Sequence, residues 1–327
     1  MKIIREDKTY IKKEKIDFTK IDKYETTKIL KSKKILKNVI EKYIVNDFSF
    51  LFDIYEEAMK TKETVSNTYK NYQKKIRTID CITLSKILQK KLEKININTY
   101  IITCKAKGFS NHVGDELIKE AHTFLLYPCY KDNKLFFVIY DPGFRILEPI
   151  TFYNKLSVKI PYKNGYIQIK YDKNNKIYPY SLNSNIRMTR DFKFISSNIK
   201  WFFNPYEETK NIDDFHKYVF QAKFSYKIMR YDPNPDNCIC IGLNIITKQL
   251  VLYTKLKEEH YYLKQIFNKT SKEIKDIIKP YLKKAKLNKK EYHKFIKLLR
   301  IIELEKASPL LFNKVLKEYS MNTKNMI

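Results

Sequence analysis

Apolar residues recur with helical spacing through the first part of the chain, and the spacing then changes to that of strands. Residues 26–44 have apolar side chains every three or four positions, which predicts an amphipathic helix, and residues 48–61 continue the pattern. Short runs rich in β-branched and aromatic residues follow, separated by turn sequences such as Lys-Asp-Asn-Lys. These runs predict strands over 97–104, 121–127, 135–141 and 166–171.

The C-terminal half repeats the change between strands and helices. Strand-like runs cover 223–231 and 238–254, and helical spacing follows over 270–285 and 288–307. Thr270 and Glu273 have the spacing of a capping box at the start of the first of these helices. We predict an α+β fold made of four segments. They are an N-terminal helical segment 1–75, a core 76–182, a β-rich extension 183–256 and a C-terminal helical segment 257–327.

Composition is typical of a folded protein without a membrane span. Hydrophobic residues make up 43% of the 327 residues, enough for a sizeable core. No apolar run approaches the ~20 residues of a transmembrane helix, and the N-terminus lacks the apolar stretch of a secretory signal. The five cysteines are odd in number and include no Cys-x-x-Cys pair, which argues against a disulfide framework and a zinc site. We therefore expect no membrane insertion and a reducing, cytoplasmic location.

The formal net charge of +29 raises the question of a nucleic-acid partner. Arginine supplies only a small minority of the 65 basic residues, and the lysines are spread along the chain. Lysine, asparagine, isoleucine and tyrosine all have A/T-rich codons, so an A/T-rich genome accounts for much of this composition. The pattern favours a solvated basic surface, and non-specific association with nucleic acid or another polyanion stays open as the alternative.

Cys81 opens a predicted helix and is the first candidate for chemistry. Leu84, Leu88, Leu92 and Ile95 form one apolar stripe, and Cys81 extends this stripe by one turn toward the N-terminus. Unpaired backbone N–H groups give the start of a helix a partial positive charge, which stabilises a thiolate, the reactive form of cysteine. A cysteine on an apolar stripe is otherwise an inert core residue, so the position alone leaves both interpretations open.

The strands that follow bring a histidine and an aspartate into range of one another. His122 begins one strand-like run, Asp141 ends the next, and the composition between them is that of a hairpin turn. With the turn centred near 131–132, His122 lies directly opposite Asp141. A carboxylate in that position fixes the tautomer of an imidazole, and an imidazolium beside Cys81 favours its thiolate.

This ordered trio resembles the core of the transglutaminase-like superfamily, which includes the arylamine N-acetyltransferases and the peptide N-glycanases and shares the papain-like cysteine fold. The family pattern is a cysteine that leads a helix, a histidine that opens a strand with an aromatic residue two positions later, and a strand that ends in Asp-Pro. Here the pattern is carried by Cys81, by His122 with Phe124 in "AHTFLLYP", and by Asp141 in "VIYDPGF".

The resemblance covers about residues 76–150 and implies both a fold and a set of roles. The fold is a papain-like, transglutaminase-like core, with a helix followed by an antiparallel sheet, flanked by N- and C-terminal helical segments. The roles are nucleophile for Cys81, general base and acid for His122, and orienting group for Asp141. Such chemistry requires no metal and no cofactor.

The chain departs from the family pattern in several places. Transglutaminases usually have Gly or Gln before the cysteine and Trp after it, whereas this chain has Asp80 and Ile82. The Arg-Gly-Gly-x-Cys signature of the N-acetyltransferases is absent, which weakens the case for acetyl-CoA chemistry. Gln73 and Tyr72 are in range to complete an oxyanion hole, and His112 competes as a base, but nothing in the sequence selects these residues.

The favoured function is thiol-dependent acyl transfer, in which Cys81 attacks an amide carbonyl of a protein or peptide substrate and forms a thioester. Water as the acceptor makes the protein a cysteine protease or amidase, the favoured interpretation, and a lysine amine makes it a cross-linking enzyme. The alternative is a non-catalytic structural or interaction protein on the same fold, a class that includes virus-associated and nucleic-acid-associated proteins. Trp201 is interpreted as a core residue or an interface anchor.

Overall fold

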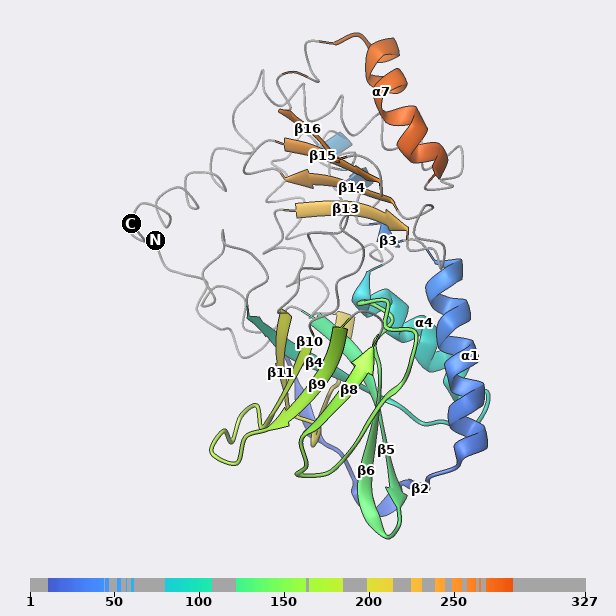
Figure 1. Ribbon diagram of the computed structural model, residues 1–327, viewed down its shortest axis with the longest axis vertical. Coiled ribbons are helices and arrows are strands. Elements are labelled where there is room, and N and C mark those ends of the chain that lie inside the picture. Colours follow the sequence, from blue (N-terminus) through green and yellow to red (C-terminus); the bar gives the residue numbers. More distant parts are fainter. Residues whose placement is uncertain are drawn as a thin grey trace. The chain divides into compact units, whose positions relative to one another are not determined.

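The chain forms two compact units, which are described separately (Figure 1). The main unit comprises residues 2–43 and 80–222, and the second unit comprises residue 1 with residues 44–79 and 223–327. Residues 183–256, predicted as a single extension, are divided between the two units. The computed structural model describes residues 11–43, 45–46, 52–53, 57, 60–61, 80–107, 122–162, 165–184, 199–213, 225–230, 239–244, 249–254, 258–262, 265 and 269–284.

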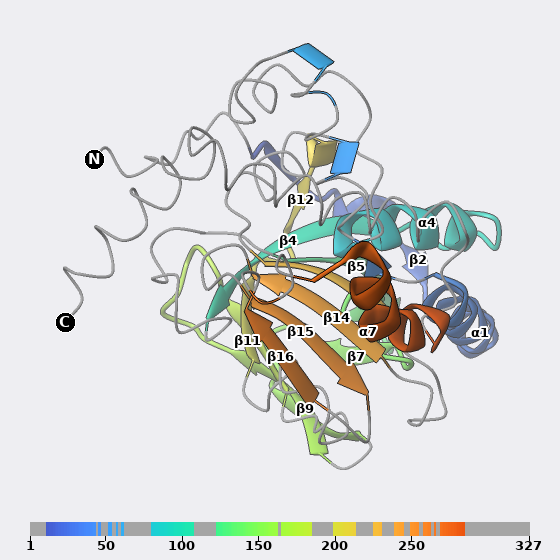
Figure 2. The same ribbon diagram turned by 90° about the horizontal axis from the view of Figure 1, so that it is seen from above.

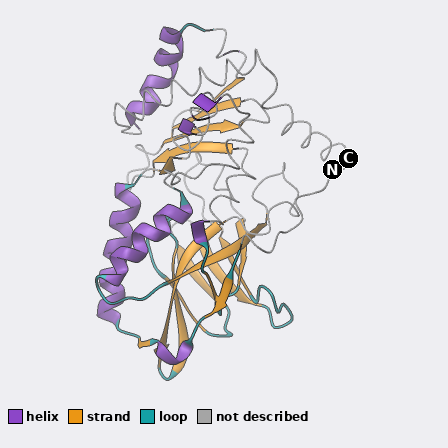
Figure 3. Cartoon of the chain, turned by 180° about the vertical axis from the view of Figure 1, so that it is seen from behind, coloured by secondary structure: helices purple, strands orange, loops and turns teal. Residues whose placement is uncertain are grey.

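Among the described residues of the main unit, the helices α1 (Thr26–Lys42) and α4 (Cys81–Glu93) accompany a large antiparallel sheet (Figure 3). The two helices pack against each other, and α4 also packs on strand β5. The strands, with one short 3₁₀ helix η2 (Phe18–Lys20), are β1 (Lys13–Lys15), β2 (Asp22–Lys23), β4 (Tyr100–Lys107), β5 (His122–Lys131), β6 (Lys134–Tyr140), β7 (Ile150–Tyr153), β8 (Val158–Tyr162), β9 (Gly165–Tyr171), β10 (Tyr180–Ser184), β11 (Ile199–Phe203) and β12 (Glu207–Thr209). The predicted α+β class and the predicted strands of this region are confirmed.

The order of the large sheet is β7-β6-β5-β4-β11-β10-β9-β8, and β2 adds to β5 in parallel. Neighbours along this order are antiparallel. Strand β4 therefore lies between β5 and β11, although β11 comes almost a hundred residues later in the chain. This pairing places side chains of β5 and β11 on either side of one central strand.

The sheet curls into a nearly closed barrel. A flat stack of eight strands would separate the edge strands β7 and β8 by about 34 Å, at ~4.8 Å per strand. Residues 154–157 alone connect these two strands, and such a connection spans at most about 19 Å. The aromatic core confirms the curl: Phe152 on β7 packs against Tyr180 on β10 and Phe203 on β11, with ring centroids 5.5 and 6.5 Å apart.

The β5–β6 hairpin turns at Asp132 and Asn133, one residue later than predicted. Their φ angles are 51° and 58°, and the flanking Lys131 and Lys134 are paired. A two-residue hairpin turn of this type needs positive φ at both central positions, which Asp and Asn adopt more readily than most residues.

The hairpin register differs from the predicted one by two residues. Leu125 is opposite Tyr140, so the prediction that His122 lies directly opposite Asp141 is wrong. Side chains on a strand alternate between faces with a period of two, so a shift of two residues leaves His122 and Asp141 on the same face of the sheet. The two side chains are thus diagonal neighbours, with Asp141 directly after the end of β6.

Helix α4 buries its apolar stripe as predicted, except at its C-terminal end. Leu84, Leu88 and Leu92 are fully buried. The helix ends at Glu93, and the chain then reverses at Asn96 with φ 56°, a left-handed C-terminal cap. The prediction that Ile95 belongs to the stripe is wrong, because Ile95 lies beyond the helix; Ile97 is the buried residue that follows the reversal.

The described residues of the second unit form a five-stranded antiparallel sheet and the helix α7 (Ser271–Lys284). The sheet has the order β16-β15-β14-β13-β3, and α7 packs on β14 and β15 (Figure 2). The predicted capping box is present, since Thr270 N–H donates to Glu273 at 2.6 Å and Glu273 N–H donates to the Thr270 hydroxyl at 3.3 Å. Its strands are β3 (Val45–Asn46), β13 (Ser225–Arg230), β14 (Ile239–Asn244), β15 (Gln249–Thr254) and β16 (Glu258–Tyr262).

Parts of the helical prediction lie outside the described residues. The predicted helix 288–307 is one of them, and only a few residues of the predicted helix 48–61 are described. Across the part of the chain that is described, none of the helices combines the length and the apolar character needed to span a bilayer.

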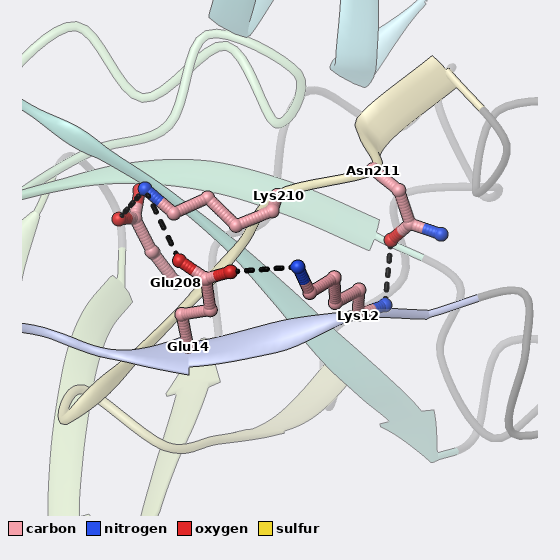
Figure 4. Close-up of polar contacts among 5 residues, drawn as sticks. All are labelled: Lys12, Glu14, Glu208, Lys210 and Asn211. Carbon is pink, nitrogen blue, oxygen red and sulfur yellow. Dashed lines mark hydrogen bonds and ion pairs between the residues drawn. The ribbon is translucent and has the colours of Figure 1, made fainter.

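An exposed network of ion pairs lies along β1 and β12 (Figure 4). Glu14 bonds Lys12 at 2.9 Å and Lys210 at 3.7 Å, and Lys210 also pairs with Glu208. The Lys12 N–H donates to the Asn211 side chain at 2.6 Å. These groups are solvated, so each pair contributes little to stability, and the lysines here behave as surface residues with acidic partners.

Candidate active site

Cys81 is the first residue of α4 and is partly exposed. Asp80 precedes it as the helix cap: its carboxylate accepts the Thr83 N–H at 2.9 Å, and its carbonyl accepts the Leu84 N–H at 2.8 Å. This cap fixes where the helix begins and hence where the sulfur lies.

The other described cysteine side chains are core residues. Cys104 and Cys129 are fully buried, and Cys104 Sγ contacts the His122 carbonyl at 3.3 Å. Burial, reinforced by the nearby carboxylate of Asp22, raises the pKa of the Cys129 thiol to about 12. Cys238 and the side chain of Cys240 lie outside the described part of the structure.

The hydrogen bond expected between His122 and Asp141 is present. His122 Nε2 lies 2.8 Å from Asp141 Oδ2, and both side chains are almost completely buried. The second oxygen, Asp141 Oδ1, accepts the Phe144 N–H at 2.9 Å. The carboxylate is thus held from two sides, and its bond to Nε2 leaves Nδ1 as the ring nitrogen available to another group.

Cys81 lies beside the same imidazole, because the space around Gly143 is bordered by both side chains. Gly143 lies against both of them. A methyl group added at Gly143 would be 2.6 Å from Cys81 Cβ and 2.9 Å from His122 Cε1, closer than such carbon atoms can approach. Position 143, which lies against the start of α4 and the edge of the imidazole, therefore has room for glycine alone unless one of these neighbours moves. The structure brings Cys81, His122 and Asp141 together, while their catalytic roles stay a prediction.

The environment of His122 favours its charged form. Burial disfavours the imidazolium and lowers its pKa, but attraction to the Asp141 carboxylate and hydrogen bonds to Asp141 and Cys81 outweigh this effect and raise the pKa to about 9. At neutral pH the site therefore contains a buried cation between a carboxylate and a thiol. This imidazolium places a positive charge next to Cys81.

Aromatic side chains enclose the imidazole. Trp201 stacks on His122 with centroids 4.5 Å apart and planes at 28°, and Phe144 meets the same ring edge-on at 4.4 Å. Trp201 also belongs to the buried core, as predicted, but its position in the site was missed by sequence reasoning. It lies on β11, and only the pairing of β11 with β4 brings it near His122. The single tryptophan of the chain is the one signal that could have singled it out.

Other residues considered from the sequence cannot be placed. Gln73, Tyr72 and His112 lie outside the described residues. Within the part of the chain that the structure describes, no group of three or more His, Cys, Asp or Glu side chains is arranged to hold a metal ion.

The fold is similar to that of a class of solved cysteine acyltransferases. No protein-family model and no curated protein sequence matches the chain. A Cys→Gln variant of the Mycobacterium smegmatis N-arylamine acetyltransferase matches with a TM-score of 0.51 and 10% identity, over 88% of this chain and 94% of that chain. The arylamine N-acetyltransferase of Mycobacterium abscessus matches with a TM-score of 0.49 and 10% identity, over 83% and 88%. That of Bacillus cereus, which has a Cys-His-Glu triad, matches with 0.44 and 13%, over 73% and 85%.

At 10% identity the Mycobacterium smegmatis match establishes similarity of fold. Helices followed by an antiparallel, nearly closed barrel are common to that structure and to this chain. The predicted resemblance to the superfamily that contains the arylamine N-acetyltransferases is thus confirmed for the fold.

Replacing Gly143 with alanine is expected to separate Cys81 from His122. The added methyl cannot fit, so either the loop or the start of α4 must move, and alkylation of Cys81 by iodoacetamide at pH 6.5 should slow by at least about tenfold. Gly242→Ala is the matched control, because a methyl there has its nearest neighbour 4.0 Å away. Equal labelling rates in Gly143→Ala and in the wild type would refute the packing described for the site.

The stability of the protein is expected to depend on pH through His122. The pKa of about 9 in the folded state exceeds the ~6.5 of an unfolded chain, so the folded state binds this proton more tightly. Its contribution, on the order of a few kcal/mol, is complete below pH 6.5 and is lost as the pH rises from about 6.5 to 9. Urea unfolding at pH 6, 7.5 and 9 should show the difference between wild type and His122→Asn shrinking with pH. A difference that is constant with pH contradicts the assignment.

Proposed function

We propose that the protein catalyses thiol-dependent acyl transfer with Cys81 as nucleophile, His122 as general base and acid, and Asp141 as the group that orients the imidazole. The observation that carries the proposal is the buried Asp141–His122 hydrogen bond, together with a partly exposed cysteine that lies beside the same imidazole. Nucleophile, base and orienting group in this order are the arrangement that thiol catalysis requires.

In the first step the Cys81 sulfur attacks the carbonyl carbon of an acyl donor. The carbonyl π electrons move to oxygen, and we assign the stabilisation of this oxyanion to the backbone N–H of Cys81. When the tetrahedral intermediate collapses, the bond to the leaving group breaks, and His122 Nδ1–H gives its proton to that group. The product is a thioester on Cys81 with a neutral imidazole beside it.

In the second step an acceptor takes the acyl group from Cys81. His122 Nδ1 accepts a proton from the acceptor as it attacks the thioester, and the C–S bond then breaks to restore the thiolate and the imidazolium. Asp141 keeps Nε2–H bonded throughout, so the same ring nitrogen serves in both steps. The stacked ring of Trp201 and the edge of Phe144 hold the imidazole in plane and limit the access of water to its faces.

Transfer to an amine is favoured over hydrolysis as the overall reaction. The fold is that of an acetyltransferase, and no comparison supports the protease or amidase predicted from the sequence. The Arg-Gly-Gly-x-Cys signature of the N-acetyltransferases is absent from this chain, which weakens the case for acetyl-CoA as its acyl donor. We therefore propose that the protein transfers an acyl group from an activated ester or thioester to an amine.

Incubation with p-nitrophenyl acetate tests the first step. Intact-mass spectrometry and peptide mapping should find one acetyl group on Cys81 of the wild type. After the same incubation, Cys81→Ser should be unmodified. Cys129→Ala, which removes a buried thiol outside the site, should acylate like the wild type. Faster loss of the acetyl group in aniline than in buffer supports transfer to an amine. Acetylation that is unchanged in Cys81→Ser refutes the proposal.

Activation of Cys81 by His122 can be measured through alkylation. Iodoacetamide at pH 6.5 should label Cys81 at least about tenfold faster than Cys104 and Cys129, because an adjacent imidazolium raises the thiolate fraction at neutral pH. Exposure alone would give a similar contrast, so the decisive variant is His122→Ala, which should slow Cys81 alone. In urea all sites should react alike. Unchanged labelling of Cys81 in His122→Ala would mean that the thiol is an ordinary one.

Non-specific association with polyanions is proposed as a secondary property. The net charge of +29 is dominated by lysine, which binds phosphate as a point charge and seldom reads bases. Fluorescence anisotropy with duplexes of unrelated sequence should give similar affinities that weaken steeply between about 50 and 200 mM salt. A preference for one sequence that persists at high salt would contradict this and favour a specific nucleic-acid function.

A further inference from the structure

Arg145 joins the loop after β6 to the last turn of α1. Its side chain is only 1% exposed. Nη1 donates to the carbonyl of Ile40, and Nη2 donates to the carbonyl of Tyr43 at 2.9 Å. The last carbonyls of a helix have no donor within the helix, and the dipole there favours a cation. One buried guanidinium therefore bonds a carbonyl in the last turn of α1 and the carbonyl of the residue that caps it, and so fixes the loop to the end of that helix.

The same loop carries the carboxylate that orients His122. Phe144 N–H donates to Asp141 Oδ1 at 2.9 Å, and Ile146 N–H donates to the Asp141 carbonyl at 3.2 Å. Arg145 N–H donates to the Pro142 carbonyl at 3.3 Å, and Arg145 has φ 57°, a conformation that is unfavourable for a residue other than glycine. A strained conformation of this kind persists only where the surroundings hold it, and the two bonds to α1 supply that hold.

We infer that Arg145 is a positioning residue for the proposed acyl transfer: by anchoring the 141–146 loop to the C-terminal turn of α1, it places the Asp141 carboxylate on His122 Nε2. The inference rests on the proposed function. It assigns a role to a side chain that is not part of the Cys81–His122–Asp141 trio. The chain of contacts runs from α1 through the guanidinium to the loop, and from Asp141 to the imidazole.

A purely structural role for Arg145, which would stabilise the packing of α1 alone, is the alternative to be separated. Tyr140 offers a matched control: it directly precedes Asp141, is fully buried, and its hydroxyl donates to Ser32 on α1 at 2.9 Å. Tyr140→Phe thus removes one buried hydrogen bond between β6 and the same helix without touching the loop. Arg145→Met removes both bonds to α1 and keeps a side chain of similar length.

The experiment compares these variants by two readouts and a thermal melt. The first readout is the rate of Cys81 alkylation by iodoacetamide at pH 6.5. The second is the proton resonance of His122 Nε2–H in protein labelled with ¹⁵N-histidine, which reports the bond to Asp141 directly. Arg145→Met should slow alkylation by at least about tenfold and shift or broaden this resonance. Tyr140→Phe should change neither, even where it lowers the melting temperature. Arg145→Lys keeps the positive charge but cannot donate to both carbonyls as the planar guanidinium does. Its alkylation rate and its Nε2–H resonance should therefore lie between those of the wild type and those of Arg145→Met.

The inference is overturned if Arg145→Met keeps the wild-type alkylation rate and resonance, or if Tyr140→Phe has equal effects at an equal loss of melting temperature. If Arg145→Met does not fold, Arg145→Lys undergoes the same comparison. Slow labelling of Cys81 in the wild type would refute the proposed function instead. The Nε2–H resonance does not depend on reactivity, so it decides the positioning role in that case as well.

Discussion

The hydrogen bond between His122 and Asp141 is the interaction on which the site depends. Removing two ionisable groups from water costs several kcal/mol for each, and their mutual attraction compensates only when other hydrogen bonds satisfy the remaining atoms. Here Asp141 Oδ1 accepts the Phe144 N–H, and Cys81 lies beside the His122 ring. A buried ion pair of this kind is weak support for stability, and perturbed groups of this type cluster at functional sites. The pair is thus better explained by chemistry than by folding.

The rest of the main unit positions this pair. The Asp80 cap sets the start of α4 and hence the place of Cys81, and the curled sheet brings β11 beside β4, so that Trp201 reaches the imidazole. Gly143 lets the loop lie close against both Cys81 and His122, and the Arg145 guanidinium holds the loop on α1. Apart from the local Asp80 cap, these contacts join segments that are distant in sequence, so the site depends on how the barrel strands and the two helices come together.

Local patterns in the sequence predicted much of this arrangement. The apolar stripe located α4, the Thr270–Glu273 spacing located the start of α7, and the order of cysteine, histidine and aspartate predicted which side chains would meet. The hairpin register was predicted incorrectly by two residues, and the pair of His122 with Asp141 survived because the period of a strand is two.

The sequence could not predict which distant strands pair. It also could not predict where the backbone of one element packs against the side chains of another. Nothing in the run around Trp201 shows that β11 pairs with β4, since a strand's partner is chosen by the whole sheet. The need for glycine at 143 and the bonds from Arg145 to the end of α1 likewise depend on how the loop and the helix come together. Both are contacts between elements, and neither leaves a periodic signal.

The most direct test of the central claim is the pH dependence of Cys81 alkylation in the wild type and in Asp141→Asn. The substitution keeps the size of the side chain and removes the charge that holds His122 protonated. If the pair activates the thiol, the wild-type rate should exceed the Asp141→Asn rate by at least about tenfold between about pH 6 and 8, where His122 of the wild type is charged. Identical profiles in the two proteins would show that the buried pair does not activate Cys81.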